Sequence, residues 1–198
     1  MTRNFDCFDE DLYDPIHRRI REIDSAVAKV ECHALYHLAR TLDVPGCIVE
    51  IGSYLGRSTC AIGYGAADSK RIVYAIDHHK GDELSGVTVG QEQGLHFNLG
   101  RFGLLGHVVM IVKDSLAAAV EWPSDKPIAM LFIDGLHTET QCKADFLAFA
   151  PYLSPRAWVC FHDYGLYGVK PAVDRFVSDG HIKQPHVVRS LAVTRVVQ

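Results

Sequence analysis

Short apolar runs alternate with amphipathic segments along most of the chain, and this alternation predicts the order of its strands and helices. Residues 15–43 carry apolar side chains at spacings of three and four, which predicts one or two amphipathic helices beginning near Pro15. The Pro45-Gly46 pair ends that pattern. Predicted strands then follow at 47–52, 71–77, 107–115, 128–135 and 157–165, separated by predicted helices at 57–66, 91–102, 116–122, 138–150 and 170–178.

The predicted strands are apolar at nearly every position, as is typical of strands buried on both faces. With helices between them, they predict a parallel sheet covered by helices on each side. Residues 186–197 are rich in β-forming side chains and can supply two closing strands. The expected fold class is therefore α/β, a Rossmann-like doubly wound sheet. We expect one domain, in which a helical segment at 1–44 packs on residues 45–198.

Composition excludes several classes of protein. The net charge of -4 provides no basic surface for nucleic acid, and no apolar run approaches the ~20 residues of a membrane helix. The acidic, aromatic N-terminus does not resemble a signal peptide. The six cysteines form no C-x-x-C pair, and four of them lie in apolar surroundings that predict buried thiols: Cys32, Cys47, Cys60 and Cys160. These features favour a cytoplasmic protein that neither binds nucleic acid nor enters a membrane.

Acidic residues end all five of the predicted central strands. In parallel sheets ligands bind beyond the carboxyl ends of the strands, so these residues are expected to share one site. Aspartate is common in turns, which accounts for one or two of them but not for five that are joined by histidines. The residues at these ends are Glu50 with Gly52, Asp77 with His78 and His79, Asp114 with Ser115, Asp134 with Gly135 and His137, and His162 with Asp163.

The loop between Gly52 and Gly56 differs from the common phosphate-binding loops. The dinucleotide motif G-x-G-x-x-G needs a middle glycine, and Tyr54 or Ser53 stands in that place. A buried Glu50 would also repel a phosphate, and no G-K-[ST] sequence is present. A ligand without phosphate and with positive charge suits this loop better. S-adenosylmethionine, which carries an ammonium, a sulfonium and a ribose diol, meets that description.

Each part of this ligand has an expected partner. Glu50 would help to hold the cationic amino-acid end, while the loop amides and the N-terminus of the next helix, near Ser58-Thr59, would bind its carboxylate. Asp77 is placed to accept both ribose hydroxyls. Asp114 and Ser115 would lie near the adenine edge.

Four segments in this order resemble class I S-adenosylmethionine-dependent methyltransferases: "VEIGSYLGRST", "AIDHHKGDE", "FIDGLHTETQCKADF" and "CFHDYG". The resemblance extends from about residue 30 to the C-terminus, and is greatest to the branch with small-molecule O-methyltransferases and cephalosporin-hydroxylase-like proteins. It implies about seven strands, the last one antiparallel. The expected cofactor-binding residues are Glu50, Gly52, Ser53, Tyr54, Gly56, Ser58, Thr59, Asp77, His78, Asp114, Ser115 and Asp134.

The same resemblance implies a second site, because several members of the family bind a divalent metal beyond strands four and five. Asp134 matches the first metal ligand and Asp163 the second member of the acidic pair, while His137 matches the catalytic base of some members. His162 departs from the pattern, since many relatives carry Asp or Glu there. Two carboxylates suit Mg²⁺, and adding His162 would favour Mn²⁺, Fe²⁺ or Zn²⁺. A hydrogen-bonded His162 without any metal remains the alternative.

The sequence thus predicts methyl transfer to a hydroxyl of a small molecule, with Asp134 and His137 as catalytic groups and possible help from a metal. A metal-dependent oxygenase, a non-catalytic adenosyl-binding module and an NAD-linked dehydrogenase are the alternatives. The N-terminal helices, the 78–90 loop and the segment after Asp163 would frame the acceptor. That loop is either a lid or a plain solvent loop, and the leading helices are candidates for a homodimer interface.

Overall fold

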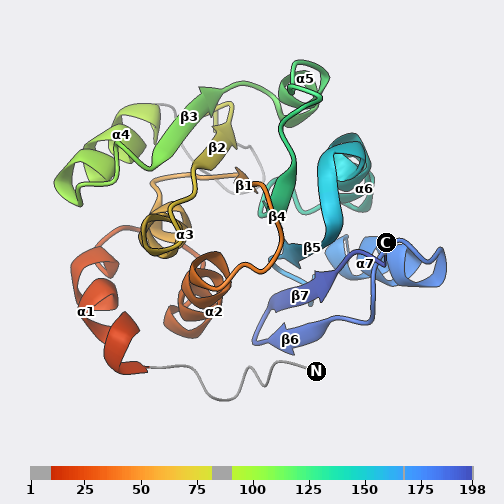
Figure 1. Cartoon of the computed structure of the whole chain (residues 1–198), viewed down its shortest axis with the longest axis horizontal. Coiled ribbons are helices and arrows are strands. Elements are labelled where there is room, and N and C mark those ends of the chain that lie inside the picture. Colours follow the sequence, from red (N-terminus) through yellow and green to blue (C-terminus); the bar gives the residue numbers. More distant parts are fainter. Residues whose placement is uncertain (1–9, 82–90, 167, 198) are drawn as a thin grey trace.

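The computed structural model describes residues 10–81, 91–166 and 168–197. Its centre is one seven-stranded sheet with the strand order β3-β2-β1-β4-β5-β7-β6 (Figure 1). The strands are β1 (Cys47–Ile51), β2 (Val73–Asp77), β3 (Val108–Val112), β4 (Ile128–Ile133), β5 (Leu153–Phe161), β6 (His186–Val188) and β7 (Leu191–Arg195). Strands β1 to β5 pair in parallel, and β7 runs antiparallel to both β5 and β6. The prediction of a Rossmann-like, mostly parallel sheet with an antiparallel last strand is confirmed.

Helices cover both faces of this sheet (Figure 1). One face packs against α1 (Glu10–Ile20), α2 (Lys29–Arg40), α3 (Arg57–Asp68) and α4 (Gln91–Arg101). The other face packs against α5 (Ser115–Val120), α6 (Glu139–Phe149) and α7 (Val169–Ser178), with a short 3-10 turn, η1 (Ala150–Tyr152), before β5. Side chains alternate between the two faces along a strand. In β1, accordingly, Ile48 belongs to the first core and Val49 and Ile51 to the second.

Three details of the sequence interpretation are wrong. Helix α1 begins at Glu10, so Pro15 lies inside it rather than at its start. Cys47, expected to be a buried thiol, is only half-buried at the beginning of β1, whereas Cys32, Cys60 and Cys160 are buried as predicted. Strand β5 begins at Leu153, four residues before the predicted start, because the segment continues pairing as far as Ile128 of β4.

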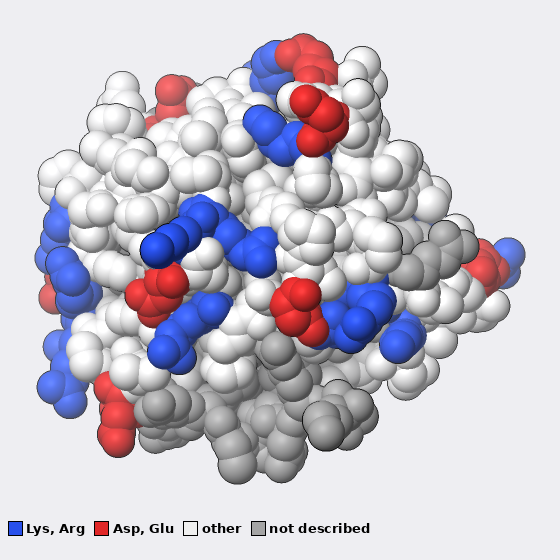
Figure 2. Space-filling view, viewed as in Figure 1, with Lys and Arg blue, Asp and Glu red and all other residues white. Residues whose placement is uncertain are grey.

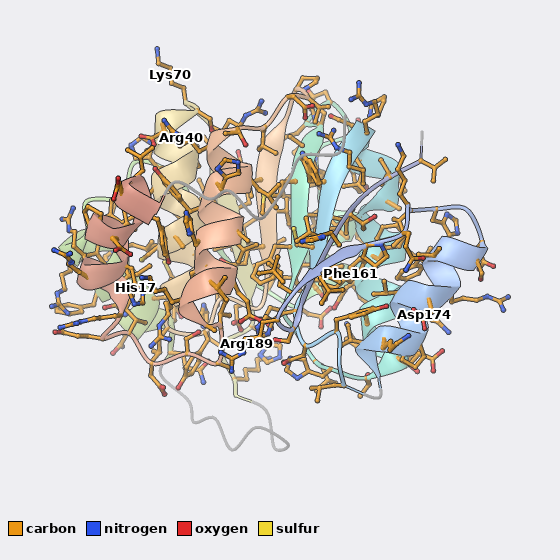
Figure 3. The ribbon with its side chains drawn as sticks, turned by 90° about the horizontal axis from the view of Figure 1, so that it is seen from below. His17, Arg40, Lys70, Phe161, Asp174 and Arg189 are labelled. Carbon is orange, nitrogen blue, oxygen red and sulfur yellow. The ribbon has the colours of Figure 1, made fainter. Side chains whose placement is uncertain are left out.

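The two ends of the sheet differ in what they carry. One end of the sheet carries Arg40, the last residue of α2, and Lys70, which comes just after α3 (Figure 3). The other end carries Arg189, which lies between β6 and β7 (Figure 3). The second end is the carboxyl edge of the parallel strands. The predicted lid falls largely on residues 82–90, which are outside the described residues.

Charged side chains of both signs lie close together over the middle of the face shown in Figure 2. Within the described part of the chain, every helix is too short or too polar to span a lipid bilayer.

Candidate functional site

A cleft of about 980 Å³ opens at the carboxyl edge of the sheet, beside β1, where the strand order reverses between β2 and β4. This is the position at which doubly wound sheets bind ligands, and the volume suits a ligand of cofactor size. Most of the predicted site residues line it: Gly52, Ser53, Tyr54, Gly56, Ser58, Asp77, His78, Asp114, Ser115, Asp134, His137 and Asp163. Glu50, Thr59 and His162 are instead buried behind its surface, at 0%, 0% and 2% exposure.

Asp77 organises the loop that follows β1. Its Oδ2 accepts hydrogen bonds from the amides of Ser53 and Tyr54, both at 3.0 Å, and its Oδ1 accepts one from His79 N at 2.8 Å. A carboxylate offers about four acceptor positions, so one position on Oδ1 remains available to a ligand hydroxyl. Asp77 therefore shapes the loop and still presents an acceptor to the cleft.

The backbone at the cleft is held in conformations that side chains rarely adopt. Tyr54, His79 and Asp163 have φ values of 47°, 50° and 53°, in the left-handed region. Such conformations cost of order 1 kcal/mol each and gather at functional sites. These three residues follow β1, β2 and β5, but Lys70, Arg156 and Arg189 also have positive φ values, so strained backbone is not confined to the cleft.

Gly52 brings two strand ends into backbone contact. Its φ is +84°, and a Cβ atom there would lie 2.1 Å from the backbone oxygen of Asp134. No other residue type fits at this approach. Gly52, which is predicted to bind the cofactor, therefore also has a structural role, because it lets the β1 loop pack against the end of β4.

Glu50 does not reach the cleft directly. Its two carboxylate oxygens accept hydrogen bonds from Ser58 Oγ at 2.6 Å and Thr59 Oγ1 at 2.5 Å, both in the first turn of α3. Burial raises the pKa of Glu50 to about 8, although these two hydroxyls act in the opposite direction. Glu50 therefore acts on the loop through the start of α3, and its expected help in holding a ligand ammonium stays a prediction.

A polar group that includes two residues absent from the sequence prediction lies beyond β3. Asp114 caps α5 by accepting from the amides of Leu116 and Ala117. Ser115 Oγ donates to Asp145 Oδ1 at 2.6 Å, and Gln141 Nε2 donates to the same oxygen at 2.9 Å. Burial raises the pKa of Asp145, which is 1% exposed. This cluster forms the end of the cleft where we expected an adenine edge.

The second predicted constellation is assembled at the ends of β4 and β5. His137 Nε2 lies 2.9 Å from Asp163 Oδ2 and 3.6 Å from Asp134 Oδ1. His162 Nδ1 lies 3.0 Å from Asp134 Oδ1 and 3.4 Å from Asp163 Oδ2. Two imidazoles and two carboxylates therefore face one another within a few ångströms.

These carboxylates raise the pKa of both histidines. The nearby carboxylates of Asp134 and Asp163 raise the pKa of His137 to about 9. Burial alone would lower the pKa of His162, but Asp134, Asp163 and Glu31 outweigh it and raise the value to about 12. With no other cation present, both imidazoles hold a proton at neutral pH, which opposes the role of general base that we expected for His137.

The arrangement also fits a divalent metal ion. One ligand atom from each of Asp134, His162 and Asp163 lies within 4.8 Å of the others. His162 Nδ1 and His137 Nε2 are buried, and neither has an aligned hydrogen-bond partner among the described residues despite the short distances to carboxylate oxygens. Atoms that converge on a common point rather than on each other are suited to a shared cation, and two carboxylates with one imidazole form a donor set for Mn²⁺, Fe²⁺ or Zn²⁺.

One wall of the cleft comes from the segment between α1 and α2. Asp24, Ser25 and Ala26 line the cleft, and Tyr54 Oη donates to Asp24 Oδ2 at 3.0 Å. The guanidinium of Arg57, the first residue of α3, donates to four backbone oxygens, those of Arg21, Ile23, Ser25 and Val27, at 2.7–3.4 Å. A single side chain thus holds the shape of this wall.

The sequence interpretation missed Glu31, Arg57, Gln141 and Asp145. A signal for Asp145 was present, because it falls on the apolar stripe of α6 between Cys142 and Phe146, where a carboxylate needs a partner. Arg57 and Gln141 occupy ordinary helical positions. Glu31 contacts His162, 131 residues away in the sequence, and no local pattern connects the two.

Comparisons with known proteins agree with this geometry. Residues 49–164 match the family described as Methyltransferase domain. A stretch of 121 residues is 30% identical to uncharacterized protein y4gI of Sinorhizobium fredii; the stretch covers 60% of this chain and 13% of that protein.

Two solved structures have the same fold at low identity. The O-methyltransferase TomG from Streptomyces achromogenes, in complex with SAM, is 18% identical with a TM-score of 0.69, and the match covers 95% of this chain and 89% of TomG. An O-methyltransferase from Bacillus cereus in complex with SAH is 15% identical with a TM-score of 0.69, covering 96% and 90%.

Proposed function

Because the chain belongs to the methyltransferase-domain family, we propose that it transfers the methyl group of S-adenosylmethionine to a hydroxyl of a small-molecule acceptor. One observation carries the proposal: the cleft at the β1–β4 reversal is ringed by Asp77, Asp114, Asp134 and Asp163 beside a loop of backbone amides. A cationic ligand without phosphate is complementary to such a site. The family match favours this reaction over the dehydrogenase and oxygenase alternatives.

The donor would lie across the β1 end of the cleft. The free acceptor position of Asp77 Oδ1 suits a ribose hydroxyl, and the amides at the start of α3 suit the donor's carboxylate. Asp145 and Ser115 suit the polar edge of adenine. The sulfonium then faces the ends of β4 and β5, where the acceptor hydroxyl must approach in line with the methyl–sulfur bond.

Asp134, His137 and Asp163 are the groups that would meet the acceptor. His137 is placed to contact the acceptor hydroxyl, and it can take the proton of that hydroxyl only after its own imidazole has lost the proton that Asp134 and Asp163 stabilise. A divalent cation held by Asp134, His162 and Asp163 would lower the pKa of a hydroxyl bound to it. The wall at 24–26 and the end of β5 would enclose the rest of the acceptor.

Calorimetry with S-adenosylhomocysteine tests the donor site. Asp77→Ala should weaken binding by about tenfold or more, since hydrogen bonds to a charged group contribute roughly 1.5–3 kcal/mol. Asp68→Ala is the matched control, because it makes the same change at the end of α3 remote from the cleft, and it should bind like the wild type. Equal affinity in all three proteins would overturn the proposed donor site.

Kinetics test the role of His137. His137→Ala should lower kcat by about 10²-fold or more while the affinity for S-adenosylhomocysteine stays unchanged. A parallel loss of donor affinity would show that His137 only supports the cleft.

A further inference from the structure

A glutamate from the N-terminal helices lies directly beneath His162. Glu31, in the first turn of α2, is 0% exposed, and its Oε2 lies 3.3 Å from His162 Nε2. The same oxygen accepts the amide of Ala28 at 2.7 Å. The other oxygen, Oε1, accepts both the amide of Ser190 at 2.8 Å and its hydroxyl at 2.6 Å. Three segments of the chain therefore fix this carboxylate.

The amide of Ala28 and the amide and hydroxyl of Ser190 fill three of the four acceptor positions of Glu31, and His162 Nε2 faces the fourth. A carboxylate oxygen held in this way accepts a hydrogen bond. His162 must consequently carry a hydrogen on Nε2 and donate it to Glu31.

This fixes what His162 presents to the cleft. With Nε2 committed to Glu31, Nδ1 is the atom that faces Asp134 Oδ1 at 3.0 Å and Asp163 Oδ2 at 3.4 Å. The side chain is 1% exposed, so water does not screen this contact, and Nδ1 is not oriented to hydrogen-bond either oxygen. A lone pair beside two anionic oxygens requires a positive charge among them.

Charge balance allows two ways to supply it. The charge is supplied either by protons on the imidazoles of His137 and His162 or by one divalent cation, and the geometry distinguishes the two. The cation satisfies the convergent, unpaired nitrogens, whereas protons on those nitrogens lack an acceptor in line.

We propose that Glu31 is a positioning residue that locks His162 to present Nδ1 as a nitrogen ligand, so that this site binds divalent transition-metal ions in preference to Mg²⁺. A histidine ligand commonly donates its other N–H to a carboxylate, which fixes the ring and increases its basicity. Nitrogen ligands favour Mn²⁺, Fe²⁺, Co²⁺ and Zn²⁺, whereas Mg²⁺ selects oxygen. The inference rests on the proposed metal site, and it extends that site to the N-terminal helices.

The decisive measurement compares Co²⁺, Zn²⁺ and Mg²⁺ affinities of the wild type and Glu31→Gln by calorimetry. The variant should lose about 10- to 100-fold in affinity for Co²⁺ and Zn²⁺, as removal of such partners commonly does, and less than about threefold for Mg²⁺. Ser190→Ala is the matched control, because it removes one hydroxyl from the opposite oxygen of the same carboxylate and should leave all three affinities near wild type. The visible absorption of bound Co²⁺ should change in Glu31→Gln and not in Ser190→Ala.

The outcomes separate the inference from the function that it rests on. Equal losses for Mg²⁺ and Co²⁺, with an unchanged Co²⁺ spectrum, would make Glu31 merely structural and overturn the inference. Wild-type Co²⁺ affinity in Glu31→Gln would overturn it while leaving the metal site intact. A wild type that binds none of the three ions would overturn the metal site and the inference together, and the donor site would still stand on S-adenosylhomocysteine binding.

Discussion

Glu31 and Glu50 are two fully buried glutamates on the same side of the sheet, and the protein treats them in opposite ways. Glu31 accepts from an imidazole, two amides and a hydroxyl, and its pKa falls to about 2. Glu50 accepts from two neutral hydroxyls, and burial raises its pKa to about 8. Burial is common to both, so the partners decide the charge: a cationic partner and several donors keep Glu31 ionised, while two hydroxyls leave Glu50 close to neutral.

The difference separates two kinds of support for the cleft. Around Glu31, the carboxylate and the His162 imidazole form a buried pair, and the removal of either partner leaves the other with an uncompensated charge. The Glu50 side is a nearly neutral hydrogen-bonded cap on the start of α3, which tolerates partial loss. The two sides should therefore respond differently to substitution and to pH.

The largest effect is expected from His162→Phe, measured in the presence of EDTA. Phenylalanine keeps the edge contact that His162 makes with Phe132, but it leaves Glu31 buried without its cationic partner. Breaking a buried ion pair in this way costs about 3–5 kcal/mol, and urea denaturation measures the free energy of unfolding. Adding Glu31→Gln to the variant should recover a substantial part of the loss. If the free energy of unfolding of His162→Phe lies within about 1 kcal/mol of the wild-type value, the surroundings of Glu31 and Glu50 do not differ as described.

An intermediate, pH-dependent effect is expected from Glu50→Gln. The folded pKa of about 8 exceeds the value of 4.5 for a free side chain, so the folded protein holds a proton that the unfolded chain releases. The stability from Glu50 is complete below about pH 4.5 and is lost as the pH rises through about 8. Each pH unit inside this window costs the wild type about 1.4 kcal/mol, and the glutamine is unaffected.

The matching measurement is denaturation of both proteins at about pH 5 and about pH 7. Other titrating groups are common to the two proteins and cancel in the difference. The variant should gain about 2–3 kcal/mol relative to the wild type between these values. A difference that is constant with pH would mean that Glu50 is ionised throughout and resembles Glu31 after all.

The smallest effect is expected from Ser58→Ala. It removes one of the two hydroxyl donors to Glu50 and should cost about 1 kcal/mol of stability, as a typical single hydrogen bond does. Thermal unfolding measures this loss, and S-adenosylhomocysteine binding reports whether the start of α3 has moved. A loss as large as that of His162→Phe would contradict the view that the Glu50 cap is neutral and tolerant.

The fold was predictable because its signals are local. Each buried strand, such as the one from Ile128 to Ile133, is apolar at every position, and the acidic residue that follows it marks the carboxyl edge. Strand–helix–strand units have right-handed crossovers, so the carboxyl ends of the parallel strands come to lie along one edge of the sheet. For this reason Asp77, Asp134, His137 and Asp163 were found from the sequence and do line one cleft.

The depth of the site was less predictable. Spacing locates Glu50 and His162 at strand ends, but the alternation of side chains sends both into the layer under α2 and α3, away from the cleft surface. Within residues 15–43, the apolar Val30 is one of the positions from which the helices are predicted, yet it is 42% exposed, whereas its neighbour Glu31 is buried. The chain leaves the helical conformation between Ile20 and Lys29, so the periodicity of α1 cannot be carried into α2.

The hydrogen bonds of Arg57 to the backbone of residues 21–27 have a consequence for substitutions in this wall of the cleft. Within the described residues its guanidinium donates to main-chain oxygens, so these four contacts do not depend on which side chains residues 24–26 carry. Of the three cleft-lining residues on this wall, Asp24 accepts a hydrogen bond from Tyr54 Oη and Ser25 Oγ accepts one from Val27 N. A substitution at Ala26 would therefore alter the lining of the cleft with the least disturbance of the backbone that Arg57 holds.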